Sequence, residues 1–406
     1  MDWYEMTILS WVLWILLLLP LLYWFSLAVA SIKAPSCPNN GNRIPQTRFA
    51  LAIPAHNEEA VISETVQRLL QMDYPAELFR VCIVADYCDD QTAFLARQAG
   101  ALVFERNTGK RTGKGAALQW LFQQVLQEPG LDAIVVFDAD TLVDPSFLRI
   151  MDARLANGSQ VIQGQHVISN PSDGWFPALT WAMFLIDNRY QNLGRVNLGL
   201  SAKHMGDSIC FQTDVLRKLG WGEGLTEDYQ LRHRLVLAGY RIDYEHQAKG
   251  YGEAPLGWEQ ARKQRLRWLK GTRESNRGNI RQMLAAAIRE RSMAIMDCVL
   301  QAVIPSFSTI AAFAMGFLIL QVLVNLILPA PIFPRNVLIA WICLVVLAFF
   351  YPMGGLLLEK APLKAYLVIL TGPFFILWRT ILVLRIFLGK GEISWVRTQH
   401  GRKKAD

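Results

Sequence analysis

Three short strings in the middle of the chain combine the residue types that a group-transfer reaction needs. They are Asp138-Ala139-Asp140, Thr226-Glu227-Asp228 and Gln264-Arg265-Leu266-Arg267-Trp268. The first offers two carboxylates after an apolar stretch, and the second offers carboxylates where a helix is predicted to begin. In the third, the i, i+3 and i+4 spacing puts a glutamine, an arginine and a tryptophan on one helix face. A cation site, a base and an aromatic-cationic clamp suggest transfer of a group from an anionic donor.

The acidic pair Asp138 and Asp140 stands at the carboxyl end of a predicted strand, where open α/β sheets bind ligands. Two hard oxygen donors at this spacing can share an Mg²⁺ or Mn²⁺ that also takes diphosphate oxygens. Such an ion would neutralise a leaving diphosphate. Taken alone, the pattern fits a solvated turn equally well, so the metal interpretation depends on the other motifs.

Residues near the ends of the first two predicted strands could bind a nucleotide. Asp86 could accept hydrogen bonds from a base or a ribose, whereas Asp89 and Asp90 fit helix capping. Groups that could bond a base follow the first strand at Pro54, Ala55, Asn57 and Glu58. Ordinary turn chemistry explains this second set about as well.

A glycine-punctuated loop at residues 109–115 carries Lys114 just before a predicted helix. A cation at a helix N-terminus can hold phosphate, so Lys114 is a candidate phosphate ligand. Lys110 and Arg111 in the same loop are explained slightly better as solvated side chains.

The remaining two strings could supply a base and an acceptor clamp. Asp228, with Glu227 beside it, could take the proton of an acceptor hydroxyl, although carboxylates are also common in first helical turns. Arg267 can bind diphosphate, Trp268 can stack on a sugar ring and Gln264 can bond hydroxyls. An amphipathic membrane helix is the alternative for this string. One base and one metal fit a single displacement.

The elements that position these residues alternate between strand and helix, as in an α/β domain. Strands are predicted at residues 49–54, 80–85, 101–104, 132–137, 161–168, 207–211 and 241–245. Helices are predicted at residues 57–72, 90–99, 114–126, 145–156, 175–190 and 227–237. No Gly-x-Gly-x-x-Gly follows the first strand, which argues against a dinucleotide site.

The composition indicates a membrane protein. Of the 406 residues 52% are hydrophobic and only 18% are charged, and the net charge is +7. Residues 11–32 carry no charge and are long enough to span a bilayer, and an acidic start favours an uncleaved anchor over a signal peptide. Lys33, Arg43 and Arg48 follow, which predicts that the next domain faces the cytosol. The basic clusters suit anionic lipid or diphosphate rather than nucleic acid, and the six scattered cysteines indicate free thiols.

The predicted organisation has five parts. They are an anchor at 1–34, a catalytic domain at 48–256, amphipathic interface helices at 257–296, membrane or interfacial segments at 297–390 and a basic cytosolic tail at 391–406. The apolar stretches at 299–329 and 337–358 read as spans. The stretch at 363–388 is interrupted by Thr371-Gly372-Pro373, and a re-entrant or interfacial element there would keep the tail in the cytosol.

In this order and between membrane segments, the motifs resemble those of the membrane-bound inverting family-2 glycosyltransferases. That group includes cellulose, hyaluronan and chitin synthases, nodulation chitooligosaccharide synthases and ceramide glucosyltransferase. The resemblance covers about residues 48–290. It implies a GT-A domain, a nucleotide-sugar donor that is usually a UDP-sugar, and Mg²⁺ or Mn²⁺.

The resemblance also assigns roles residue by residue. It implies that Asp86 contacts the nucleotide, that Asp138 and Asp140 bind metal and diphosphate, and that Asp228 is the base. It further implies that Gln264, Arg267 and Trp268 hold diphosphate and acceptor, with Gly206 and Asp207 in an acceptor-side loop.

The sequence does not decide which kind of molecule accepts the sugar. We expect an enzyme of the bacterial inner or plasma membrane that builds a β-linked polysaccharide or oligosaccharide. The alternative is transfer of one sugar to a lipid such as a diacylglycerol, a ceramide or a polyprenyl phosphate. Fewer spans than cellulose synthase and no clear gating-loop motif put processivity in doubt. The motifs fit a nucleotidyltransferase or a transporter less well, and the sequence indicates no oligomeric state.

Overall fold

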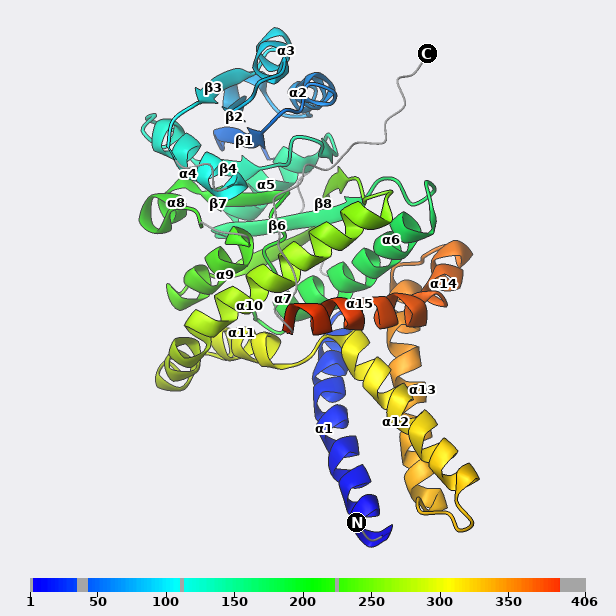
Figure 1. The fold of residues 1–406 in the computed structure, drawn as a ribbon. Coiled ribbons are helices and arrows are strands. Elements are labelled where there is room, and N and C mark those ends of the chain that lie inside the picture. The colour runs from blue at the N-terminus through cyan, green and yellow to red at the C-terminus, as the bar shows by residue number, and fades with distance from the viewer. Residues whose placement is uncertain (1–2, 35–42, 110–112, 223–225, 388–406) are drawn as a thin grey trace.

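The computed structural model describes residues 3–34, 43–109, 113–222 and 226–387. Figure 1 shows two parts, an α/β sheet domain and a group of long helices that extends away from it. Most of the linker after the anchor, the predicted tail at 391–406, and Lys110 and Arg111 lie outside the described residues.

Within the described residues, eight strands form one mixed sheet in the order β3-β2-β1-β4-β7-β6-β8-β5. The first four are parallel, β7 is antiparallel to both β4 and β6, β6 runs parallel to β8, and β5 is antiparallel to β8. Their bounds are β1 Phe49–Ala55, β2 Phe79–Asp86, β3 Leu102–Arg106, β4 Ala133–Val136, β5 Leu142–Val143, β6 Val161–Ile168, β7 Ile209–Gln212 and β8 Ile242–Gly252.

The sheet is buried on both faces because its strands alternate apolar residues between two cores. In β1, Phe49, Leu51 and Ile53 enter one core, whereas Ala50 and Ala52 enter the other. The first core is closed by α2 (Ile62–Leu70), α3 (Thr92–Gln98) and α5 (Phe147–Ala156). The second is closed by α4 (Lys114–Val125), α8 (Thr213–Leu219) and α9 (Glu227–Leu237). The predicted α/β class is therefore confirmed.

Several element boundaries differ from the sequence prediction, and β5 and α8 were not predicted. The helix expected from residue 57 begins at Ile62, because residues 57–59 bond the loop after β2 instead. The strand expected at 241–245 continues to Gly252, across a register shift opposite Gly164 and Gln165. The helix expected at 175–190 is α6 (Trp175–Asp187), continued by the π-helix η2 (Asn188–Leu193) and by α7 (Gly194–Asn197).

Three helices among the described residues are long and apolar enough to cross a membrane: α1 (Trp3–Ala30), α12 (Phe307–Ile327) and α13 (Arg335–Leu358). They extend together away from the sheet domain (Figure 1). The predicted span at 299–329 is not continuous, since α11 (Met293–Val303) ends before Pro305 and α12 starts after it. Proline lacks the amide hydrogen that a helix interior needs, which explains the break.

The last apolar stretch forms two helices, α14 (Leu363–Ile369) and α15 (Gly372–Phe387), with a bend of 43° between them. The break falls at the predicted Thr371-Gly372-Pro373 interruption. In Figure 1, α15 lies across the end of α12 instead of beside it, and it contacts the long α10 (Trp258–Arg289). The pair is a fourth span or a re-entrant element by its length and composition. The interfacial placement stays a prediction.

Buried charges join the anchor helix to the sheet domain. Asp297 of α11 accepts hydrogen bonds from the Tyr23 hydroxyl of α1 at 2.7 Å and from Nε of Arg195 in α7 at 2.9 Å. Arg195 is fully buried, so this pairing compensates a charge that would be costly to leave alone. These bonds therefore fix α1, α7 and α11 relative to one another.

The same junction depends on Gly194, where a Cβ atom would collide with the backbone carbonyl of Leu27 in α1. Gly194→Ala is expected to destabilise the protein by about 1–3 kcal/mol through overpacking. Thermal unfolding of the detergent-solubilised chain should show a lower midpoint. Gly278→Ala in α10 is the matched control, because a Cβ there would meet nothing within 4 Å. An unchanged midpoint for Gly194→Ala would contradict the close packing of α7 on α1.

Candidate active site

The predicted site residues converge on one cavity of about 2010 Å³ at the carboxyl edge of the sheet. Those that line it are Pro54, Ala55, Glu58, Asp86, Lys114, Asp138, Asp140, Gly206, Asp207, Glu227, Asp228, Gln264, Arg267 and Trp268. Of the predicted set, only Asn57 is not among the lining residues. Residues from all three strings thus face a common space, although they are up to 130 positions apart in the sequence.

The side of the cavity where the sequence predicts nucleotide binding is formed by the loops after β1 and β2, which bond each other. Asn57 has a φ of 55° and exchanges hydrogen bonds with Asp89. The His56 ring bonds the Asp86 carbonyl through Nδ1 at 2.8 Å. These contacts hold the Asp86 carboxylate at the cavity wall, and they give Asn57 a structural role between the loops.

Asp86 itself is paired with a residue that the sequence did not single out. Nη1 of Arg106, at the end of β3, contacts Oδ1 of Asp86, and both side chains are almost fully buried. The guanidinium of Arg106 also lies over the Tyr87 ring at 5.6 Å. The pairing compensates the buried carboxylate and fixes its orientation.

Lys114, the first residue of α4, connects two parts of the site. Its Nζ donates to Oδ1 of Asp138 and to the carbonyl of Gly206, the latter at 2.5 Å. Burial lowers the pKa of Lys114, but the carboxylates of Asp138 and Glu227 outweigh this effect and raise it overall. The ammonium group is therefore charged and placed between the acidic pair and the loop before β7.

Asp207 acts as a positioning residue for that acidic pair. Its Oδ1 accepts hydrogen bonds from the Asp138 amide and the Thr141 hydroxyl, both at 3.1 Å. Its Oδ2 bonds Nδ1 of His166 at 2.9 Å and the Ser208 hydroxyl at 3.0 Å. Burial raises the pKa of Asp207, but the hydrogen bond and charge of His166 reverse this and lower it overall. With 2% of its surface exposed, Asp207 orients the Asp138 loop.

The two carboxylates at the start of α9 lie opposite Lys114. Burial raises the pKa of Asp228, and burial together with the negative charge of Asp228 raises the pKa of Glu227 to about 7. A Cβ added to Gly206 would stand 3.4 Å from Oδ2 of Asp228. The glycine therefore brings backbone next to this carboxylate. Raised pKa values in a cavity are typical of functional acids and bases.

The third string lies on α10, which packs closely against the start of α9. A Cβ on Gly271 would collide with the methyl group of Thr226 and stand 2.7 Å from its hydroxyl. The absence of a side chain at Gly271 lets α10 approach, so that Gln264, Arg267 and Trp268 reach the cavity that contains Asp228.

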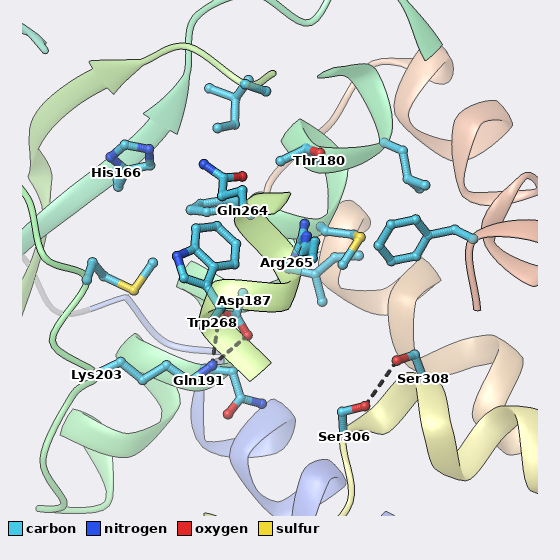
Figure 2. Close-up of a pocket in the computed structure, with 18 of the residues that line it drawn as sticks. His166, Thr180, Asp187, Gln191, Lys203, Gln264, Arg265, Trp268, Ser306 and Ser308 are labelled. Atoms are coloured by element: carbon cyan, nitrogen blue, oxygen red, sulfur yellow. Dashed lines mark hydrogen bonds and ion pairs between the residues drawn. The ribbon is translucent and has the colours of Figure 1, made fainter. Parts of the chain in front are cut away.

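Arg265, which the sequence analysis left without a role, stacks its guanidinium on Trp268 at 5.0 Å and on Phe375 of α15 at 5.6 Å. Figure 2 shows Arg265 beside Gln264 and Trp268 in the cavity. This aromatic-cationic stack brings the last apolar helix to the edge of the site. The contact joins distant parts of the chain, so no local pattern could reveal it.

The residues present suit a divalent cation that is bound partly by protein carboxylates and partly by the phosphates of a donor. Among the described residues there is no group of three or more His, Cys, Asp or Glu side chains that could hold a metal ion. Asp138 and Asp140 both line the cavity. Mg²⁺ is commonly held by one or two carboxylates plus substrate phosphates, and this pair suits that arrangement.

The fold resembles that of known glycosyltransferases. The mannosyltransferase PcManGT from Pyrobaculum calidifontis, solved in complex with GDP-Man and Mn²⁺, is similar over 85% of this chain and 97% of that chain. The TM-score is 0.53 and the sequence identity is 18%. The α/β domain therefore has the GT-A fold, as the sequence analysis predicted.

The family follows from the sequence match. Residues 45–271 match the family described as "Glycosyltransferase like family 2". The chain belongs to this family, which confirms the resemblance.

Two relatives are named for different products. A beta-monoglucosyldiacylglycerol synthase of Synechocystis is 27% identical over 58% of this chain and 50% of its own length. A poly-beta-1,6-N-acetyl-D-glucosamine synthase of Staphylococcus aureus is 27% identical over 58% of this chain and 56% of its own length. The chain thus spans about half the length of the curated relatives it matches.

Proposed function

We propose that the protein transfers a sugar from a UDP-sugar to an acceptor hydroxyl, with inversion at the anomeric carbon. The observation that carries this proposal is the single cavity that contains Asp138, Asp228 and Trp268. The first is suited to the donor diphosphate, the second to the acceptor proton and the third to a sugar ring.

In this mechanism the acceptor oxygen attacks the anomeric carbon while the bond from that carbon to the diphosphate oxygen breaks. Asp228 takes the hydroxyl proton, and UDP leaves with the electron pair. Lys114 and Arg267 bind and orient the anionic diphosphate, and Asp86 contacts the nucleoside. A bound Mg²⁺ or Mn²⁺ at Asp138 and Asp140 would supply Lewis-acid neutralisation of the leaving group. One displacement on one carbon inverts its configuration.

The enzyme is proposed to work at a membrane with the catalytic domain in the cytosol. The three candidate spans support membrane association, and the basic residues after α1 support this orientation. A bacterial inner or plasma membrane is the proposed location. A growing β-linked glycan and a membrane lipid both suit the chemistry, and relatives named for each product match the chain.

The test is UDP release from a panel of UDP-sugars by the full chain in lipid nanodiscs, with Mg²⁺ or Mn²⁺ and with a chelator. Release that needs the metal and one particular UDP-sugar is expected. Asp228→Asn serves as the control for background hydrolysis. If wild type and variant release UDP equally, or if neither does, the catalytic proposal is wrong.

The acid limb of the pH profile is expected to lie above the pH range in which an ordinary aspartate titrates. Only the ionised Asp228 can accept a proton, and its raised pKa means that it is protonated at a higher pH than an ordinary carboxyl group. The rate of UDP release should therefore begin to fall at a higher pH than an ordinary aspartate would give as the pH is lowered. Glu227→Gln removes a nearby negative charge and should move the limb to lower pH. A wild-type limb near the ordinary aspartate pKa of roughly 4 would contradict this account.

A further inference from the structure

The cavity does not end at Trp268 but continues between the apolar helices. Beyond the ring of Trp268 it is lined by Thr180, Asp187, Gln191 and Lys203 of the sheet domain. Figure 2 shows Lys203 reaching Asp187 on the side of Trp268 away from His166, with Ser306 and Ser308 farther along. Side chains of α12 and α13, two of the candidate spans, form the rest of the wall. The lining of the cavity thus changes from polar near Trp268 to apolar between α12 and α13.

This deeper part of the cavity opens towards the outside of the helix group. Phe313, Ile319 and Phe350 line the cavity and are nevertheless 53%, 51% and 59% exposed. They belong to α12 and α13, which would be surrounded by acyl chains if they span the bilayer. A side opening at this level gives a lipid direct access. A glycan chain would lose hydrogen bonds to water along such a wall without replacing them.

The polar part of the cavity, between Trp268 and the apolar wall, contains an ion pair that no sequence motif predicts. Nζ of Lys203 donates to Oδ1 and Oδ2 of Asp187 at 3.0 and 2.9 Å. Both side chains are partly exposed and both line the cavity. Because the two charges balance, the pair offers hydrogen-bonding capacity without adding a net charge to the cavity. It suits hydroxyl groups better than a phosphate.

We propose that the acceptor is a membrane lipid with an uncharged, hydroxyl-bearing head group. The Asp187–Lys203 pair holds the head group below Trp268, and the acyl chains lie along α12 and α13. The proposal rests on the proposed function, because the lipid hydroxyl is the group that attacks the anomeric carbon. The new bond joins that oxygen to the sugar, the proton goes to Asp228 and UDP departs. The product is one glycosylated lipid.

The first test measures lipid binding without turnover. The full chain in phosphatidylcholine nanodiscs is irradiated with a diacylglycerol that carries a diazirine in one acyl chain, and the adducts are mapped by peptide mass spectrometry. Adducts on α12 and α13 that unlabelled diacylglycerol suppresses are expected. Lipid adducts without UDP release would overturn only the proposed function. UDP release without adducts on these helices would overturn the lipid site.

The second test blocks the cavity at Gly316 of α12, where a Cβ would meet nothing within 4 Å. Gly316→Trp fills this space and is expected to raise the KM for diacylglycerol by at least about tenfold, equivalent to about 1.4 kcal/mol of lost binding. Leu326→Trp is the matched control, since Leu326 lies on the same helix, is 76% exposed and does not line the cavity. An unchanged KM in Gly316→Trp, or a ladder of glycan products from the wild type, would overturn the proposal.

A third test addresses the charge of the head group. Wild-type adducts are expected to be suppressed by diacylglycerol better than by phosphatidic acid. Asp187→Asn removes the negative partner of Lys203, so it should shift this preference towards phosphatidic acid. If the wild type already prefers phosphatidic acid or polyprenyl phosphate, the assignment of an uncharged head group is wrong.

Discussion

Replacing Asp228 by asparagine is expected to lower kcat for sugar transfer by about 10²–10⁴-fold, the usual contribution of a positioned general base. Asparagine keeps the size of the side chain but cannot take the acceptor proton. The KM for the UDP-sugar should change little, because Asp228 acts on the acceptor and the donor is held by other residues. Initial rates of UDP release and calorimetric binding of UDP measure the two effects separately.

The matched control is Asp214→Asn on α8. That carboxylate is exposed and pairs with Arg217 at the surface, where ion pairs contribute little. Its activity should equal that of the wild type. If Asp228→Asn retained wild-type kcat, the base would have to be another group. If it lost UDP binding as well, Asp228 would belong to the donor site.

The strand-end motifs were readable from the sequence because their geometry is local. Asp138 and Asp140 follow β4, and the carboxyl ends of parallel strands meet at one edge. Lys114 was found for a similar reason, since it begins α4 at the same edge. The helical spacing of Gln264, Arg267 and Trp268 likewise needs no knowledge of the rest of the fold.

The partners of these residues were not readable, because tertiary contacts define them. Asp207 was predicted to lie in an acceptor-side loop, and its carboxylate bonds Thr141 and His166, which are 66 and 41 positions away. The Arg106 partner of Asp86 comes from a different strand. The Lys203–Asp187 pair joins α6 to the loop before β7 and has no motif. Local patterns identify chemistry, whereas packing decides which groups face the ligand.

The second large effect is expected at Gly271, which contacts no part of the proposed reaction. Gly271→Ala would place a methyl group against Thr226, two positions before Asp228, and force α10 away from α9. A displacement of about 1 Å can cost about 10²-fold in rate when reacting groups must be aligned. Because Arg267 and Trp268 move with α10, kcat should fall and the KM for the donor should rise. Steady-state kinetics with the UDP-sugar measure both.

A double variant distinguishes this steric cause from a general loss of stability. Thr226→Ala removes the methyl and hydroxyl groups that the new side chain would meet, leaving the Cβ at 3.0 Å. Gly271→Ala with Thr226→Ala should therefore recover much of the activity, a coupling that independent sites do not show. Gly278→Ala on the same helix meets no atom within 4 Å and should leave the rate unchanged. The opposite outcome is a double variant that is no more active than Gly271→Ala alone. In that case the Gly271–Thr226 contact does not set the distance between Asp228 and the Arg267 and Trp268 side chains of α10.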